Sequence, residues 1–308
     1  MAQLQLGTLS PILVTGDSGF VGQHVLASWP GAVGLSALGP AMDVRDQAAL
    51  VAGLRRLQPR AVLHLAARSF VPDSFRAPEL TFEVNVMGTL RLLQALAETG
   101  FAGRFLFVGS SDAYGLVPQD ALPITEERAL RPRNPYAASK AAAEALCFQW
   151  SQCGPFEVLM ARPFNHIGPG QSAEFVMSDF ARQVARVAAG QQAPVLEVGN
   201  LAATRDFLSV LDVVRAYALV LTDGHKSEIY NVCSGSECSV QSLLMRLLAL
   251  SGVEVEIRVD SARFRPADQP RMCGSFAKLH QHTGWQPQHS LDQTLLDMFR
   301  FWEKKIVS

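Results

Sequence analysis

The chain has 308 residues, of which 48% are hydrophobic and 18% are charged, and its formal net charge is -1. This composition excludes a disordered or fibrous chain, and the length allows one or two domains around a large core. A net charge this close to zero provides no global basic field for nucleic acid or for an anionic membrane surface, so we expect neither partner.

The sequence indicates a cytoplasmic protein. No apolar run approaches the roughly 20 residues that span a bilayer, and the first residues lack the sections of a secretory signal peptide. The five cysteines show no Cys-x-x-Cys spacing, which favours free thiols in a reducing compartment. His280 and His282 come without an acid or thiol cluster, so we expect no metal site.

A glycine-rich turn follows the first apolar run. Residues 11–15 read as a buried parallel strand, and residues 20–28 read as a helix. Glycines between a strand and a helix allow a sharp turn and a close approach of the backbone to a pyrophosphate, which the helix N-terminus then attracts. The cofactor-binding residues expected from this turn are Gly16, Gly19, Phe20, Val21 and Gly22.

Strands and helices then alternate along the chain. The pattern predicts helices at 46–57 and 80–98, and strands at 61–65, 104–109 and 157–161. Such alternation predicts an α/β fold, a Rossmann-like doubly wound parallel sheet with a smaller C-terminal substrate-binding α/β region. Ligands bind beyond the carboxyl ends of such strands, where Gly16, Ala66, Ser110 and Arg162 fall.

The expected cofactor is NADP(H), with NAD(H) possible. NAD sites usually carry an acid about 20 residues beyond the glycine turn, and here no acid occurs before Asp43. A missing carboxylate removes repulsion against a 2'-phosphate, although no arginine takes its place. Asp43 and Val44 are expected to contact the adenine; alternatively, Asp43 caps the helix that follows.

Tyr136 and Lys140 lie four residues apart, so a helix presents both on one face. A phenol with a pKa of about 10 is a poor proton carrier at neutral pH, and a nearby cation favours its ionised form. Such a pair can give a proton to a carbonyl oxygen while a nicotinamide delivers hydride. Two ordinary surface residues would also satisfy the spacing, and it is the glycine turn upstream that favours the catalytic interpretation.

These two residues, the glycine turn and the segment 64–67 together resemble the extended short-chain dehydrogenase/reductase family, over nearly the whole chain. Segments 68–75, 85–89 and 162–170 resemble its GDP-mannose branch, which contains 4,6-dehydratases and 4-keto-6-deoxymannose reductases.

The resemblance implies a role for each matching residue. Ser110 would hold the substrate oxygen, Tyr136 would carry the proton, and Lys140 would bind the nicotinamide ribose. The further cofactor contacts implied are Leu65, Ala66 and Ala67. The substrate contacts implied are Ser110, Ser111, Asp112, Asn165, Arg205, Arg265 and Asp268. Planar arginines suit a diphosphate; the alternative is that Arg205 and Arg265 form surface ion pairs with Asp206 and Asp268.

The implied reaction is the NADPH-dependent reduction of the C4 ketone of GDP-4-keto-6-deoxy-D-mannose to GDP-D-rhamnose, in deoxysugar biosynthesis. A dehydratase needs a base for C5, which is a glutamate in GDP-mannose dehydratases. Here that position is Asp112, one methylene shorter, which favours the reductase. The alternatives are a GDP-mannose 4,6-dehydratase that uses Asp112, a nucleotide-sugar epimerase, or a non-catalytic NADP-binding regulator.

Two parts of the chain are expected to enclose one cleft. Residues 1–165 and 206–233 would form the NADP-binding domain, and residues 166–205 and 234–308 would form the sugar-nucleotide region. Family resemblance further implies a homodimer formed through two long helices, at about 80–98 and 136–152.

Overall fold

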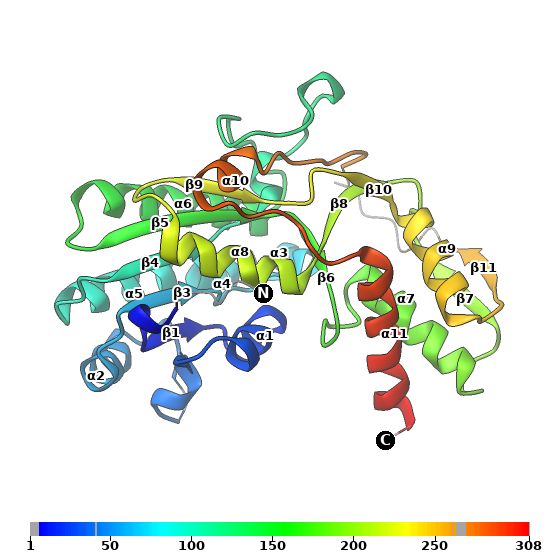
Figure 1. Cartoon of the computed structure of the whole chain (residues 1–308), viewed down its shortest axis with the longest axis horizontal. Coiled ribbons are helices and arrows are strands. Elements are labelled where there is room, and N and C mark those ends of the chain that lie inside the picture. Colours follow the sequence, from blue (N-terminus) through cyan, green and yellow to red (C-terminus); the bar gives the residue numbers. More distant parts are fainter. Residues whose placement is uncertain (1–5, 41, 261, 263–268, 308) are drawn as a thin grey trace.

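The large part of the molecule is built on one parallel sheet. A computed structural model describes residues 6–40, 42–260, 262 and 269–307 (Figure 1). Six strands lie in the order β2-β1-β3-β4-β5-β9, and every neighbouring pair is parallel, as predicted for a doubly wound fold. The strands are β1 (Ile12–Thr15), β2 (Ala32–Gly34), β3 (Ala61–His64), β4 (Arg104–Val108), β5 (Glu157–Pro163) and β9 (Ile229–Val232).

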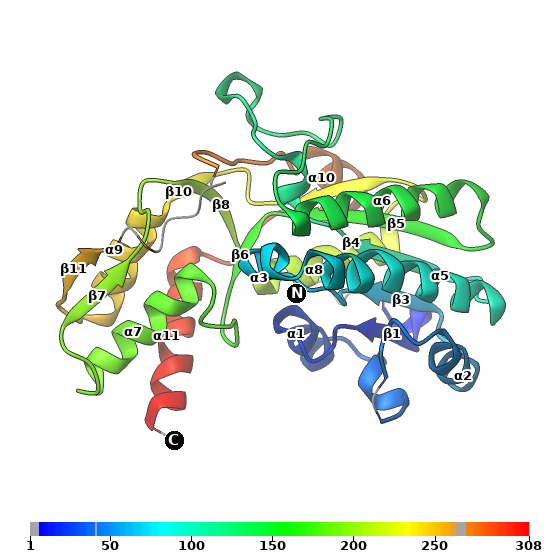
Figure 2. The ribbon, with the colours of Figure 1, turned by 180° about the vertical axis from the view of Figure 1, so that it is seen from behind.

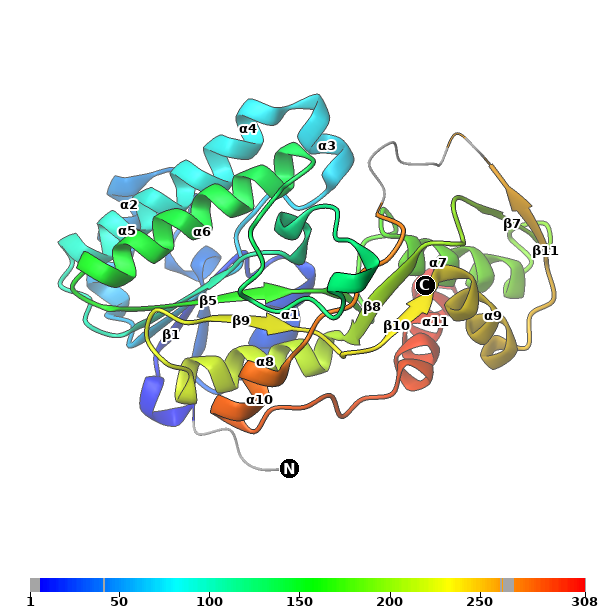
Figure 3. The same cartoon turned by 90° about the horizontal axis from the view of Figure 1, so that it is seen from above.

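Helices cover both faces of this sheet because its strands are apolar on both sides. Alternate residues point to opposite faces, so Leu13 and Phe105 pack on one layer while Val14 and Leu106 pack on the other. Figure 3 shows α2, α5 and α6 on one side, with α8 and α10 on the other. The helices of these two layers are α1 (Phe20–Ser28), α2 (Gln47–Leu57), α5 (Gly88–Glu98), α6 (Pro135–Cys153), α8 (Val210–Asp223) and α10 (Ala277–Thr283).

Several short helical segments connect these layers. The helix expected at 80–98 is present but is interrupted by a π-helical turn, a feature that often marks functional sites. The short segments are η1 (Gly7–Leu9), η2 (Leu35–Leu38), α3 (Val71–Arg76), α4 (Pro78–Phe82), η3 (Glu83–Met87), η4 (Ser111–Tyr114) and η5 (Gln119–Ala121).

A smaller region packs beyond the carboxyl ends of the large sheet (Figures 1 and 2). Its core lies among three helices, with Phe180, Leu247 and Met298 buried between them. The helices are α7 (Val176–Ala188), α9 (Val240–Ser251) and α11 (Leu291–Val307). A three-stranded and a two-stranded sheet complete it, formed by β6 (Asn165–Ile167), β7 (Val195–Val198), β8 (Thr204–Ser209), β10 (Glu237–Ser239) and β11 (Glu256–Val259).

The chain crosses between the two regions more than once. It leaves the large sheet after β5, builds β6, α7, β7 and β8, and returns with α8 and β9. Within the expected second part, Leu279 and Trp285 are buried in the core of the large sheet, beside α8. None of the described helices is both long enough and apolar enough to cross a membrane.

Candidate active site

A cleft of about 1290 Å³ lies where the large sheet meets the smaller region. One wall comes from the carboxyl ends of the parallel strands, the position at which ligands bind in such sheets. The opposite wall comes from α7 and β8, through residues such as Phe175, Arg182 and Arg205. Residues that are far apart in the sequence therefore face one another across a single cavity.

The glycine turn closes one end of the cleft. Gly16 has φ +70°, and a Cβ there would lie 2.7 Å from the Ala66 backbone nitrogen. A Cβ at Gly22 would collide with the Gly16 carbonyl and with Asp17. The turn thus needs glycine both for its left-handed backbone and for close packing of strand on helix. Helix α1 begins directly behind it without a side-chain cap, so its first amides can serve an anion.

Asp17 was not among the predicted site residues. Its buried carboxylate accepts hydrogen bonds from the hydroxyl and the backbone N–H of Ser36, just beyond β2. Gly34 permits this approach, because a Cβ there would overlap the carboxylate. Asp17 therefore ties the glycine turn to the segment after β2, but it does not line the cleft. In the sequence, only the position of Asp17 inside the glycine motif could have indicated its contact with Ser36.

Ser110, Tyr136 and Lys140 all line the cleft. Ser110 follows β4 and caps η4, where its Oγ accepts a hydrogen bond from the Asp112 N–H at 3.2 Å. Tyr136 and Lys140 share one face of α6, as their spacing predicts. The side chains of Tyr136 and Ser110 are hydrogen-bonded, and the Lys140 Nζ donates to the Val108 carbonyl at 2.7 Å.

Burial dominates the electrostatics of this trio. It raises the pKa of Tyr136 above its ordinary value, and the charge of Asp112 acts in the same direction. The hydrogen bond with Ser110 lowers that pKa and so opposes both effects. Burial also lowers the pKa of Lys140 to about 8. The expected shift of Tyr136 toward its ionised form is therefore not found; burial holds it as a neutral phenol, the form that can donate a proton.

Two polar side chains tie neighbouring segments to this trio. His64, at the end of β3, is hydrogen-bonded to Thr15 Oγ1 at 2.7 Å and to Thr89 Oγ1 at 2.9 Å. Asn85, in the π-helical turn, donates to Ser139 Oγ at 2.8 Å and accepts from the Arg68 N–H at 2.8 Å. These bonds link β1, β3, α5, α6 and the loop that follows β3.

Most of the predicted site residues line the cleft. Those that do so are Gly16, Gly19, Phe20, Val21, Gly22, Leu65, Ala67, Ser110, Ser111, Asp112, Tyr136, Lys140, Asn165 and Arg205. Ala66 lies just behind the wall, against Gly16. Asp43 pairs with Arg45 and Val44 is buried in the core, so neither lies on the cleft wall. Arg265 and Asp268 lie outside the described residues.

The cleft also contains groups that the sequence did not single out. Arg76, Arg133 and Arg182 line it and bring cationic side chains from three different segments. Tyr217 of α8 lines it as well, with its side chain buried. Arginines in loops and a tyrosine in a buried helix have no local sequence signal. Among the described residues, no group of three or more metal-ligating side chains gathers.

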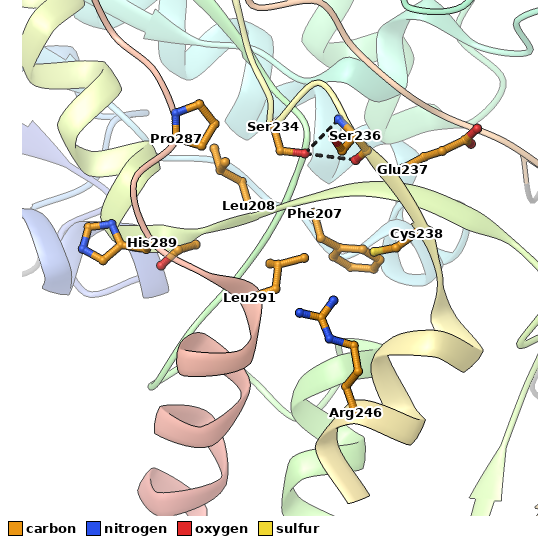
Figure 4. A pocket seen from close by; sticks show the side chains of 11 residues that line it. Phe207, Leu208, Ser234, Ser236, Glu237, Cys238, Arg246, Pro287, His289 and Leu291 are labelled. Carbon is orange, nitrogen blue, oxygen red and sulfur yellow. Dashed lines mark hydrogen bonds between the residues drawn. The ribbon is translucent and has the colours of Figure 1, made fainter. Parts of the chain in front are cut away.

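A second, smaller pocket of about 220 Å³ lies behind Phe207, which lines both cavities (Figure 4). Polar groups at this pocket bond to protein partners: Ser234 to Asp206, and Arg246 to Asp292. It therefore forms part of the packing between β8, β10 and the start of α11.

The residues of the large cleft fit a dinucleotide. The tight turn can form only because Gly16 and Gly22 carry no Cβ to collide with the neighbouring backbone, and the uncapped amides of α1 behind it can bind a pyrophosphate. The trio lies in the same cleft, where a nicotinamide and a carbonyl compound can meet.

Comparisons with known proteins agree with this geometry. The family model described as GDP-mannose 4,6 dehydratase matches residues 40–298. A GDP-6-deoxy-D-mannose reductase of Pseudomonas aeruginosa is 47% identical over 96% of this chain and 98% of its own. A GDP-mannose 4,6 dehydratase of Arabidopsis thaliana is 31% identical over 80% of this chain and 66% of its own.

Solved structures show the same fold. The Pseudomonas aeruginosa protein RMD, in complex with NADPH, superposes with a TM-score of 0.89 at 44% identity, covering 96% of this chain and all (100%) of that one. A UDP-glucose 4-epimerase of Thermus thermophilus with NAD gives 0.83 at 29% identity, covering 94% and 98%. The chain therefore belongs to the extended short-chain dehydrogenase/reductase family, within its GDP-mannose 4,6 dehydratase branch.

Proposed function

We propose that this protein reduces the C4 ketone of GDP-4-keto-6-deoxy-D-mannose to GDP-D-rhamnose with NADPH. The observation that carries the proposal is the meeting of Ser110, Tyr136 and Lys140 in one cleft beside the glycine turn. Similarity to a GDP-6-deoxy-D-mannose reductase, and to a structure in complex with NADPH, supports the substrate and the cofactor.

Each side chain of the trio has a separate role in the reduction. Ser110 Oγ accepts the Asp112 N–H and is hydrogen-bonded to Tyr136, so its O–H would turn to the ketone oxygen when the substrate binds. Tyr136, held as a phenol, gives that oxygen a proton as the carbon is reduced. Lys140 binds the nicotinamide ribose, and NADPH supplies the hydride. The phenolate left on Tyr136 regains a proton from solvent, which completes the proton balance.

Recognition of the nucleotide falls to the smaller region. Arg205 and Arg182 line the cleft opposite the glycine turn, where their guanidinium groups suit a diphosphate. Binding energy from this remote part of the substrate holds the sugar in line with the trio. Asn165, at the start of β6, lies between the two walls and is assigned to the sugar.

Asp112 favours one second candidate, a GDP-mannose 4,6-dehydratase. Its charge acts on Tyr136, and it lines the cleft where a base for C5 would be needed. The shorter side chain makes it a poorer fit than the glutamate of dehydratases, because proton abstraction depends on reach. Supplying GDP-mannose with catalytic NADP separates the two: a dehydratase makes the keto sugar, and a reductase does not.

The test of the main proposal is direct. The enzyme mixed with GDP-4-keto-6-deoxy-D-mannose and NADPH should consume NADPH in equal amount to the ketone reduced. Tyr136→Phe should lower kcat by about 10²- to 10⁴-fold, because only the proton donor is removed. NADPH binding, followed by fluorescence, should stay within about twofold of wild type. Loss of binding together with turnover would contradict the role of Tyr136.

We further propose that the protein is cytoplasmic and dimeric. All five cysteines are free thiols, which suits a reducing compartment. The dimer would form through α5 and α6, which lie side by side on one face of the sheet (Figures 2 and 3).

A further inference from the structure

The helix that carries Tyr136 has a third polar residue on the same face. Tyr136, Lys140 and Glu144 are spaced by four residues, so they form one row along α6. The first two lie in the cleft, whereas Glu144 is buried about one turn beyond Lys140. Neither the glycine turn nor the proposed proton transfer uses it. A buried carboxylate must have a strong partner, since its desolvation is otherwise costly.

That partner is Arg162 on β5. Arg162 Nε donates to Glu144 Oε2 at 2.8 Å, and Arg162 Nη2 donates to Glu144 Oε1 at 2.6 Å. The two side chains are only 5% and 6% exposed, and the bond is bidentate. A planar guanidinium held by two parallel bonds to a carboxylate has little freedom to rotate or slide. Helix α6 is thereby fixed against β5 at one position.

The same guanidinium holds the turn that carries Ser110. Arg162 Nη1 donates to the Tyr114 phenol oxygen at 2.8 Å and to the Glu126 carbonyl at 3.1 Å. Tyr114 is the last residue of η4, which Ser110 caps. The Tyr114 hydroxyl in turn donates to Asn231 Oδ1 on β9 at 2.7 Å. The Tyr114 hydroxyl thus accepts one hydrogen bond from Arg162 and donates one to Asn231, and the two partners together fix its position.

We infer that Arg162, Glu144 and Tyr114 are positioning residues that set the distance between Ser110 and Tyr136. This inference deepens the proposed reduction and rests on it. One rigid group serves both elements of the trio: Glu144 ties it to α6, and Tyr114 ties it to η4. The Ser110–Tyr136 hydrogen bond spans the gap between those elements, and proton transfer is steeply sensitive to such distances, since about 1 Å of misplacement can cost about a hundredfold.

Tyr114→Phe is the sharpest probe, because it removes one oxygen and leaves the Arg162–Glu144 pair in place. The chain offers a matched control in Tyr230→Phe. Tyr230 is also fully buried, and its hydroxyl also has two partners, His282 Nδ1 at 2.8 Å and the His225 N–H at 2.8 Å. It precedes Asn231 on β9 and points to the opposite face of the sheet, away from the trio.

Two measurements decide the inference. Crystal structures of both variants should show a displacement of Ser110 Oγ relative to Tyr136 Oη in Tyr114→Phe alone. In kinetics, Tyr114→Phe should lower kcat about tenfold or more and increase the solvent deuterium isotope effect. The KM for the keto sugar and the Kd for NADPH should stay within about twofold, and the Tm should fall no further than in Tyr230→Phe.

An unchanged Ser110–Tyr136 distance in Tyr114→Phe, or a kcat equal to that of Tyr230→Phe, would overturn the inference. So would a loss of kcat that merely follows a loss of Tm. The crystallographic measurement does not depend on the reaction. A wild-type enzyme that leaves the keto sugar untouched therefore refutes the proposed function, while the displacement still decides whether the three residues position the pair.

Discussion

At the scale of single residues, the cleft is governed by what burial does to ionisable groups. Lys140 is buried and Tyr136 is partly buried, and loss of solvent favours the neutral form of each. For the tyrosine this preserves the proton that a ketone reduction requires. For the lysine it lowers the pKa, so that the side chain loses its charge within the pH range in which the enzyme can be assayed.

Lys140 therefore predicts a pH dependence of cofactor binding. With a pKa of about 8 in the free protein, its ammonium is lost as the pH rises through 8, and with it a donor and a positive charge beside the ribose. The Kd for NADPH should accordingly increase by up to about tenfold between pH 7 and pH 9. Fluorescence titrations measure it, with Lys140→Met as the control.

In Lys140→Met the Kd for NADPH should be higher than in wild type at pH 7 and should not change between pH 7 and pH 9. A wild-type Kd that is equally flat would show that Lys140 does not contribute its charge to binding.

At the scale of elements, the strand–turn–helix unit is held by close backbone contacts. Gly16→Ala should weaken NADPH binding more than tenfold, because its Cβ would press on the Ala66 and Leu65 backbone and open the turn. The left-handed φ adds about 1–2 kcal/mol of strain. Isothermal titration with NADPH measures the first effect, and urea unfolding measures the second.

Gly252→Ala separates these contributions. Gly252 has φ +67°, almost the same as Gly16, but a Cβ there meets nothing within 4 Å. It should therefore show the loss of stability from the backbone strain with unchanged NADPH affinity. Equal NADPH binding in the two variants would mean that steric contact at the turn is unimportant.

His64 links β1, β3 and α5, and its burial makes this junction sensitive to acid. Its pKa is lowered to about 3, so the unfolded chain binds a proton that the folded chain does not between roughly pH 6.5 and pH 3. Stability should consequently fall as the pH drops through this window, by about 1.4 kcal/mol per pH unit from this residue.

The measurement is the free energy of unfolding in urea at pH 7, 5.5 and 4, compared between wild type and His64→Asn. The variant lacks this titration, so its pH slope should be shallower, while the carboxylates contribute equally to both proteins. It should also be less stable at pH 7, because the bonds to Thr15 and Thr89 are changed. Parallel pH profiles would argue against the linkage.

At the scale of the whole molecule, the proposed dimer is the assembly that remains to be measured. Large apolar side chains are exposed on α4, η3 and α6, beside α5; they include Leu80, Phe82, Met87 and Phe148. Phe148, 48% exposed, lies on α6 among them. Phe148→Glu should halve the mass measured by light scattering, since it places a charge in the proposed interface.

Leu250→Glu is the comparison for this variant. Leu250 is 39% exposed and lies on α9, at the far end of the molecule. It should leave the mass unchanged. If both variants have the same mass as the wild type, the two long helices do not form the proposed interface.

The amino-acid sequence determined the features that depend on neighbours along the chain. Short buried apolar runs that alternate with segments of helical period predicted the doubly wound parallel sheet, which is confirmed, whereas its strand order comes from the structure. Glycine spacing located the turn, and a four-residue interval put Tyr136 and Lys140 on one face. Each of these signals is contained in a few consecutive residues.

Tertiary structure alone decided the contacts between distant segments. It carries Asp17 to the end of β2, brings arginines from separate loops into the cleft, and joins Arg162 to Glu144 and Tyr114. Tyr114 and its partner Asn231 are separated by 117 positions. Such pairs form only once the strand order and the helix packing are set, so no local pattern of residues predicts them.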